Sequence, residues 1–374
     1  MNRSPAGEPD ATDGDGSGAG AALYSYALPL REPLATGRGP LRYRRGLLVR
    51  LRDRDGRAGW GDAAPLAGWH GPDLETTAAA LAGWLRTAAP CEEPETLAAR
   101  AGATLREVPC AWAAVAGAAS DLAARRRGVS LASFLAAPGG SPAGPVPTAA
   151  LVEGDSPESV AVSAAAAGAA GHRTLKMKVG TGPLPDDVAR VAALRQAAPD
   201  AALRLDANGA WGAAAGDALR ALARFEPELV EEPVRGLAQL RRLQEGSDVP
   251  IAADESLPPL TELHRHLPLG VAAAVLKPSA LGDPVAVLRA AAALTETGTG
   301  AIIGSFMESA VGVATAAHVA AVAAGPAAGL GTSALLRSDV CEPPAVRGGA
   351  VQLPAGPGLG LEPGGGMKLL ETFG

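Results

Sequence analysis

Three acidic residues stand at regular intervals in the second half of the chain, each at the end of a short apolar run. Asp206, Glu231 and Asp254 are 25 and 23 residues apart. Three carboxylates in one pocket repel each other unless a cation compensates for them. Oxygen ligands that leave positions open for water and substrate suit Mg²⁺, with Mn²⁺ as an alternative. The spacing therefore predicts a divalent-cation site, the alternative being that each acid caps the helix after its strand.

Lysines flank these acids on both sides in the sequence. Lys176 and Lys178 alternate along one apolar run, so their side chains point the same way. Two ammonium groups held close together lower each other's pKa, which would let one act as a base near neutral pH. Lys277 ends a later run and is expected on the opposite side of the site. The alternative for each lysine is a solvated surface charge.

These residue types suit the abstraction of a proton next to a carboxylate. Such a proton is weakly acidic, so the negative charge left on the substrate must be strongly stabilised. A cation bound to the substrate carboxylate supplies that stabilisation, and a lysine accepts the proton. The pattern therefore predicts an enzyme acting on a small carboxylate.

The elements that must position these residues are eight short apolar runs that alternate with helix-like segments. They recur about every 25 residues, the repeat expected of a (β/α)₈ barrel, in which catalytic groups lie at the carboxyl ends of the strands. An open doubly wound sheet is the alternative, but it rarely needs eight regular units. The runs span residues 148–152, 174–179, 202–206, 228–231, 250–254, 271–276, 301–304 and 328–331.

A different pattern precedes the barrel. An Asp-Gly turn between two apolar runs, at residues 53–56, predicts a hairpin. Apolar residues at three- and four-residue spacing predict helices over 74–88, 93–102 and 110–127. This mixture of strands and helices predicts a separate α+β domain, joined to the barrel by a Gly/Pro-rich connector.

We therefore expect an α/β protein divided into four parts. Residues 1–22 carry Gly, Ser, Asp and Pro without the apolar core of a signal peptide, which predicts a disordered tail. The α+β domain is expected over 23–140 and the barrel over 146–335. The Gly/Pro-rich segment 336–374 is expected to return to the first domain.

Composition excludes several classes of function. A net charge of −6 and an aromatic content of 3% provide no basic, aromatic face for nucleic acid. No apolar stretch is long enough to span a membrane. The three cysteines lack metal-ligand spacing, which favours a reducing cytoplasm.

At the strand-end residues the chain resembles the enolase superfamily over nearly its whole length. With lysine at position 277 and no histidine at the strand ends, the chain resembles the muconate-cycloisomerase-like branch. The resemblance implies a TIM-like barrel closed by a capping domain, which the N-terminal region and the C-terminal end build together. It also implies Asp206, Glu231 and Asp254 as Mg²⁺ ligands between facing acid–base lysines.

Four segments are most similar to the o-succinylbenzoate synthase family. Residues 59–70 resemble its capping-domain loop, and residues 204–211, 276–282 and 329–332 resemble its third, sixth and eighth strand motifs. The resemblance implies a carbon–oxygen hydro-lyase of menaquinone biosynthesis. Its reaction is the dehydration of 2-succinyl-6-hydroxy-2,4-cyclohexadiene-1-carboxylate through an enediolate.

The resemblance also assigns a role to each residue. Lys178 is the implied base, Lys277 the implied cation–π partner on the other ring face, and Lys176 a group that tunes the base. The residues implied to orient the substrate or the metal ligands, or to bind the succinyl group, are Arg204, Asn208, Ser305 and Ser309.

Residues 304–312 resemble the dipeptide epimerases of the same branch as well. The second candidate is therefore an N-acylamino-acid racemase or dipeptide epimerase, with Lys178 and Lys277 as opposed bases. Against an epimerase, residues 329–331 contain no acid to hold a dipeptide ammonium. A barrel with a Schiff-base lysine and a barrel without catalytic activity are the further alternatives.

Overall fold

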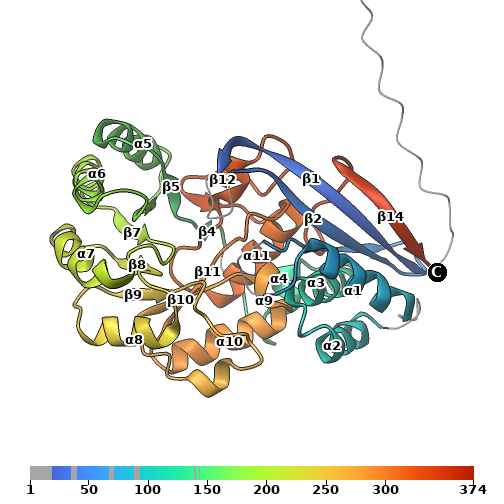
Figure 1. Cartoon of the computed structure of the whole chain (residues 1–374). Helices are drawn as coiled ribbons and strands as arrows, with labels where there is room; N and C mark the ends of the chain where they lie inside the picture. Colours follow the sequence, from blue (N-terminus) through green and yellow to red (C-terminus); the bar gives the residue numbers. More distant parts are fainter. Residues whose placement is uncertain (1–18, 35–39, 67–70, 88–92, 139, 143) are drawn as a thin grey trace, which may run out of the picture.

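The computed structural model describes residues 19–34, 40–66, 71–87, 93–138, 140–142 and 144–374 of the chain. An antiparallel sheet with its helices lies beside a curled parallel sheet that carries helices on its outside (Figure 1). In the described ranges, no helix is both long and apolar enough to cross a membrane.

Four antiparallel strands form the capping sheet, in the order β14-β1-β2-β3. The predicted hairpin is confirmed: β2 pairs with β3 around a turn in which the Asp53 carboxylate accepts the Asp55 and Arg57 backbone N–H groups. Strand β14, from the end of the chain, pairs with β1. The strands are β1 (Gly20–Leu34), β2 (Leu41–Arg52), β3 (Ala58–Ala63) and β14 (Met367–Phe373).

The boundary predicted for the N-terminal tail, after residue 22, lies too far along the chain. Gly20, Ala21 and Ala22 already belong to β1, where they pair with β2, and Ala21 and Ala22 also pair with β14. A strand that gains backbone partners on both sides can be ordered even where its side chains are small. Residues 1–18 lie outside the described residues.

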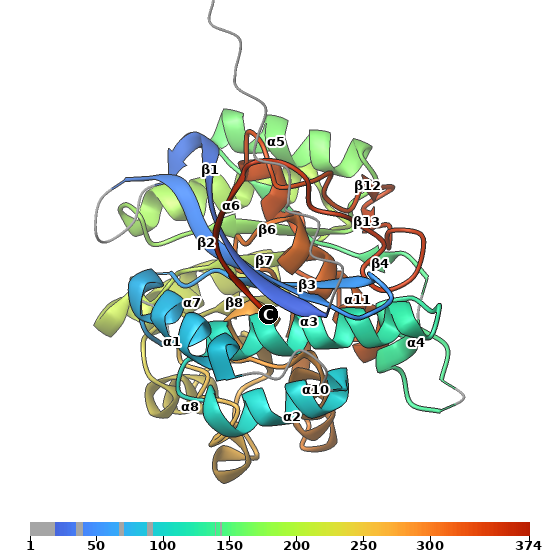
Figure 2. The ribbon, with the colours of Figure 1, turned by 90° about the vertical axis from the view of Figure 1, so that its right-hand side faces the viewer.

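Helix α3 is the buried centre of the capping domain. It packs against β3 and α2, and Figure 2 shows it running beneath the capping sheet. The three predicted helices are confirmed, and a short fourth helix begins at a cap in which the Ser130 hydroxyl accepts the Ser133 N–H. The helices are α1 (Leu74–Thr87), α2 (Pro94–Thr104), α3 (Pro109–Arg126) and α4 (Leu131–Leu135).

Seven parallel strands in chain order form the barrel sheet. Both faces of the sheet are covered. Most of the apolar side chains of the strands are buried in a cluster shared with the helices, and a second buried cluster consists of Leu229, Ala252, Ala273, Val275 and Ile302. The strands are β5 (Ala150–Val152), β6 (Thr174–Lys178), β7 (Ala202–Asp206), β8 (Leu229–Glu231), β9 (Ile251–Ala253), β10 (Ala273–Leu276) and β11 (Gly300–Ile303).

The eighth predicted run closes the barrel without forming a full strand. Ala328 makes a parallel bridge to Thr148, and Gly329 makes one to Gly304. The segment thus fills the gap between β5 and β11. Its two glycines carry no side chain to pack, which weakens a regular strand. Strand β4 (Val146–Pro147), just before β5, joins β13 (Ala350–Val351) and β12 (Val346–Arg347) in a small separate sheet.

Helices follow most barrel strands, as a βα repeat requires. After β9 the connection contains only a 3₁₀ turn, at Leu263–His266. The other short 3₁₀ segments are Gly212–Ala214, Ala223–Phe225 and Gly331–Leu335. The helices are α5 (Pro157–Ala169), α6 (Leu184–Ala197), α7 (Ala215–Leu222), α8 (Leu237–Glu245), α9 (Pro278–Leu281), α10 (Pro284–Glu296) and α11 (Ala310–Ala323).

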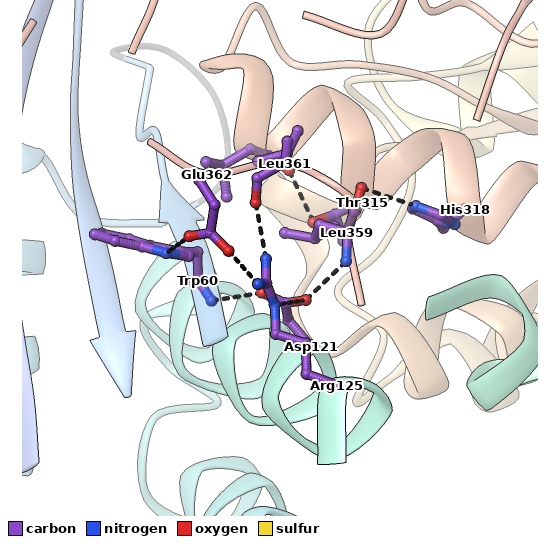
Figure 3. A network of polar contacts seen from close by, with 9 residues as sticks. Trp60, Asp121, Arg125, Thr315, His318, Leu359, Leu361 and Glu362 are labelled. Atoms are coloured by element: carbon purple, nitrogen blue, oxygen red, sulfur yellow. Dashed lines mark hydrogen bonds and ion pairs between the residues drawn. The ribbon is translucent and has the colours of Figure 1, made fainter. Parts of the chain in front are cut away.

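A buried carboxylate ties the C-terminal segment to the capping domain (Figure 3). Asp121, on α3, accepts the backbone N–H groups of Trp60 at 2.9 Å and Leu359 at 2.7 Å. Arg125 pairs with the same carboxylate at 3.0 Å and also with Glu362. Three distant parts of the chain therefore meet at the Asp121 carboxylate. Without these partners, burying its charge would cost free energy.

Candidate active site

The three predicted acids lie side by side at the carboxyl ends of adjacent strands. Asp206 ends β7, Glu231 ends β8, and the two residues pair in register. Asp254 directly follows β9, the next strand in the sheet. All three are buried, with exposed fractions of 4, 3 and 2%. Strand order alone brings them together, because parallel strands present their carboxyl ends at one edge.

Two lysine ammonium groups lie among these carboxylates. The Lys176 Nζ is 2.9 Å from Asp206 Oδ2 and 2.7 Å from Glu231 Oε1. The Lys277 Nζ is 2.6 Å from Asp254 Oδ2. Each buried negative charge therefore has a positive partner, which is what allows ionised groups to be buried at all.

The lowered pKa expected for Lys176 is corrected by this arrangement. Burial lowers the pKa of Lys176, but the charges of Asp206 and Glu231 outweigh burial and raise it above its ordinary value. Burial disfavours ionisation of Glu231, yet the Lys176 and Lys277 charges bring its pKa down to about 2. Lys176 is thus held as a cation by the two carboxylates that it contacts.

Lys178 and Lys277 occupy opposite sides of the acid group. Lys178 ends β6 and Lys277 follows β10, and the three acid-bearing strands lie between them in the sheet. The Lys178 side chain is exposed at the barrel mouth. Its backbone carbonyl accepts the Arg190 guanidinium at 3.2 Å. These positions agree with two groups that approach a substrate from different faces.

The three predicted acids, all of which the structure describes, do not form a preformed carboxylate cage. Among the residues that the structure describes, no group of three or more His, Cys, Asp or Glu is arranged to hold a metal ion. The physical reason is that Lys176 bridges Asp206 and Glu231 where a cation would otherwise compensate for them. The donor set nevertheless fits a hard cation, since Asp254 Oδ1 is buried without a hydrogen-bond partner. The role of Asp206, Glu231 and Asp254 as metal ligands stays a proposal.

Asn208 lies at the mouth as expected, held in a left-handed conformation at φ 44°. Its backbone N–H donates to Asp206 Oδ1 at 3.1 Å, and its side-chain amide donates to Glu255 Oε1 at 3.0 Å. Sequence reasoning set Glu232 aside in favour of Glu231 and did not predict its contact, in which the Glu232 carboxylate accepts the Asp254 N–H at 3.0 Å and so shapes the end of β9. Its only signal was the acidic pair at 231–232.

The structure does not support the substrate-orienting role expected for Arg204. The guanidinium is buried and makes two hydrogen bonds to the Glu228 carboxylate, at 2.8 and 3.2 Å. A third bond, to the Ala327 carbonyl at 2.6 Å, also points it away from the mouth. Glu228 precedes β8, so Arg204 serves the amino-terminal end of the barrel. Strand alternation predicts only that Arg204 and Asp206 share a face, and does not predict at which end they act.

The two predicted serines are engaged by the protein itself. The Ser305 hydroxyl bonds the Gly329 carbonyl at 2.9 Å and the Thr332 hydroxyl at 2.7 Å. The Ser309 hydroxyl and N–H both donate to Asp62 of the capping domain, at 2.5 and 2.9 Å. Ser309 is fully buried and both of its polar groups are bound at this junction, so the structure does not support the succinyl contact expected of it.

A polar junction between the capping domain and the barrel was also missed. Tyr26 donates to Asp62 at 2.8 Å, on the other carboxylate oxygen from Ser309. Arg44 donates to the Pro65 carbonyl at 2.8 Å and to the Phe306 carbonyl at 3.3 Å. Of these contacts, Arg44–Phe306 and Asp62–Ser309 join residues more than 200 positions apart, so no local pattern could have signalled them.

Both the N-terminal part and the barrel part of the chain match known protein families. Residues 159–365 match the family described as enolase C-terminal domain-like, and residues 19–106 match the family described as the MenC N-terminal domain. The chain is 30% identical over 329 residues to the o-succinylbenzoate synthase of Edwardsiella ictaluri, covering 86% of this chain and 92% of that protein. It is 41% identical over 189 residues to that of Mycobacterium tuberculosis, covering 47% and 54%.

Two solved structures share the arrangement of both domains. The N-succinyl Arg/Lys racemase of Bacillus cereus superposes with a TM-score of 0.84 at 24% identity, over 94% of this chain and 99% of that one. A dipeptide epimerase of Enterococcus faecalis, complexed with Mg and the dipeptide L-Leu-L-Tyr, gives 0.82 at 26% identity, over 91 and 98%. The TIM-like barrel with a capping domain is confirmed by these likenesses. Residues 67–70, which belong to the first segment that resembles the synthases, lie outside the described residues.

Proposed function

The chain belongs to the enolase superfamily, and from this premise we propose that it is an o-succinylbenzoate synthase, a lyase that removes water from 2-succinyl-6-hydroxy-2,4-cyclohexadiene-1-carboxylate. The observation that carries the proposal is the row of three buried acids between Lys178 and Lys277. Similarity to a synthase along 92% of its length supports the same activity. Participation in menaquinone biosynthesis and a cytoplasmic location follow as part of this proposal.

The acids would hold the cofactor, and the lysines would do the proton chemistry. Asp206, Glu231 and Asp254 supply hard oxygen donors for Mg²⁺, and this requires Lys176 to give up its bridging position. A bound divalent cation supplies positive charge where negative charge develops on the substrate carboxylate. Lys176 then remains beside the acids as a second cation.

Proton transfer falls to Lys178 in this proposal. Its Nζ, at the exposed end of β6, takes the proton from the ring carbon next to the carboxylate. The same ammonium then returns that proton to the departing hydroxyl, so that water leaves and the ring becomes aromatic. Lys277 faces the ring from the β10 side, where its ammonium contributes a cation–π contact.

A racemase of N-succinyl amino acids is the second candidate. Lys178 and Lys277, on opposite sides of the acids, suit two bases that exchange one proton from both faces. The fold shared with an N-succinyl Arg/Lys racemase is compatible with this chemistry. A dipeptide epimerase is less well supported, because residues 328–331 carry no acid beside the mouth.

The test is turnover of the cyclohexadiene substrate with Mg²⁺, followed by absorbance. We expect activity from the wild type and a loss of about 10³-fold in kcat for Lys178→Ala, in the range for removal of a general base. Lys368→Ala, in an exposed lysine of β14, is the matched control and should leave turnover unchanged. Absence of wild-type product, with deuterium entering N-succinyl amino acids in D₂O, would instead establish the racemase.

A further inference from the structure

Phe306 belongs to the barrel by sequence and to the capping domain by packing. It lies between β11 and α11, yet its side chain is 3% exposed and is buried in the hydrophobic cluster that α1, α2 and α3 build with the capping sheet. Its ring therefore occupies a place where the two domains meet next to the barrel mouth.

The ring of Phe306 also lies beside the Lys277 ammonium. The Lys277 Nζ is 6.0 Å from the ring centroid, at the limit of a cation–π contact. The stem of Lys277 passes near Gly304, where an added methyl group would lie at ordinary contact distance from its Cγ (3.5 Å) and Cε (3.7 Å). The Lys277 Nζ is thus held by Asp254 at 2.6 Å and faces the Phe306 ring.

Contacts from both domains fix the position of the ring. The Phe306 N–H donates to the buried Glu308 carboxylate, and its carbonyl accepts from Arg44 of β2 at 3.3 Å. The Arg44 guanidinium also stacks on the ring, 5.5 Å from the centroid. Because Arg44 further binds the Ala64 and Pro65 carbonyls, the docked capping domain determines where Phe306 lies.

We propose that Phe306 is a positioning residue for Lys277, and that it transmits the docking of the capping domain to this lysine. The proposal rests on the proposed function in so far as Lys277 acts on the substrate. A flat ring packed in a rigid core restricts the lysine rotamers more strongly than a flexible aliphatic side chain does. The charge of Lys277 is thereby kept over the mouth when substrate displaces part of its contact with Asp254.

The experiment compares Phe306→Leu with Phe306→Tyr in the full-length enzyme with Mg²⁺. Leucine keeps an apolar side chain and removes the ring, so kcat for the cyclohexadiene substrate should fall about 10-fold with KM nearly unchanged. Tyrosine keeps the ring, so kcat of Phe306→Tyr should stay within about 3-fold of wild type. Phe134→Leu is the matched control. The Arg127 guanidinium stacks on the Phe134 ring, 4.8 Å from its centroid, and this pair lies away from the site. The kcat of this variant should equal that of the wild type.

A thermal-unfolding cycle with Lys277→Met measures the contact independently of turnover. The losses in unfolding midpoint caused by Phe306→Leu and by Lys277→Met should be less than additive. The double variant should unfold at least about 1 °C above the midpoint expected from the sum of the two single losses. Strict additivity, or a Phe306→Leu enzyme with unchanged kcat, would overturn the positioning role. Coupled midpoints in a protein whose wild type does not turn over the cyclohexadiene would support the contact and reject the proposed function.

Discussion

At the scale of single residues, charge compensation dominates the site. The sequence contains only four lysines, and three of them, Lys176, Lys178 and Lys277, stand at the carboxyl ends of barrel strands. Burial and the neighbouring Glu231 charge raise the pKa of Asp206 and of Asp254, and the lysine charges oppose this shift. A bound metal ion would therefore compete with lysine for the same oxygens.

This competition leads to a prediction for cation binding. Mg²⁺ should raise the thermal unfolding midpoint of the wild type, because a ligand that binds only the folded state stabilises it. Asp254→Asn should weaken Mg²⁺ binding by at least about 10-fold in titration calorimetry, since it removes one charged ligand. Asp217→Asn, in an exposed acid on α7, is the control. Equal affinity of all three proteins would contradict a site at Asp254.

At the scale of elements, the contact between β3 and α3 depends on glycine. A side chain at Gly61 would overlap the Ala114 carbonyl oxygen of α3, and one at Gly59 would overlap the carbonyl oxygen of Ala118. The strand can therefore approach the helix backbone directly. Because Asp62 lies between Gly61 and Ala63 on this strand, the same close approach positions the carboxylate that binds Ser309.

Substitution of Gly61 by alanine should destabilise the capping domain. The added methyl group has helix backbone as its neighbour, which cannot move aside, so we expect a loss of about 3 kcal/mol in the free energy of unfolding. Gly83→Ala is the matched control, because Gly83 is exposed on α1 with open space around it. That change should stabilise the protein by about 0.5–1 kcal/mol. Denaturant unfolding that ranks the two variants in the reverse order would refute this packing.

At the scale of the whole molecule, the C-terminal segment holds the two domains together. It leaves the barrel, contacts Asp121 of α3 and ends as β14 beside β1. His318 of α11 joins the same connection, since its Nδ1 accepts the Ala132 N–H of α4 at 3.2 Å and its Nε2 lies 3.3 Å from the Leu359 carbonyl. Barrel, capping domain and C-terminal segment therefore share one buried imidazole.

The burial of His318 predicts a pH dependence of stability. Burial lowers the pKa of His318 to about 4, although the hydrogen bond with Leu359 opposes this shift. Between about pH 6.5 and 4 the unfolded chain binds a proton that the folded chain does not, so stability falls as the pH falls. From pH 7 to 5 the wild type should lose about 2 kcal/mol more than His318→Gln.

Urea unfolding at both pH values measures this difference, and any constant cost of the substitution cancels. His264→Gln, in an exposed histidine of the 3₁₀ turn after β9, should behave like the wild type. If His318→Gln loses stability in parallel with the wild type, the imidazole titrates normally and is not the group responsible.

Local pattern was sufficient for the architecture and for the grouping of the acids. The recurrence of apolar runs depends on short-range periodicity, and a parallel barrel then brings the ends of successive strands to one mouth. Asp206, Glu231 and Asp254 could therefore be grouped from spacing alone. Even the weak eighth run, at Ala328 and Gly329, was found by its place in the repeat.

Only the tertiary structure decided which partners these side chains have. Arg204 shares a face with Asp206 but is bound by Glu228, and Ser309 follows a strand end but is bound by Asp62, 247 residues earlier in the chain. The pKa of Lys176 is raised by the carboxylates of Asp206, Glu231 and Asp254, which come from other parts of the sheet. Periodicity predicts the direction of a side chain, whereas hydrogen bonds and charges act between atoms that folding brings together from distant parts of the chain.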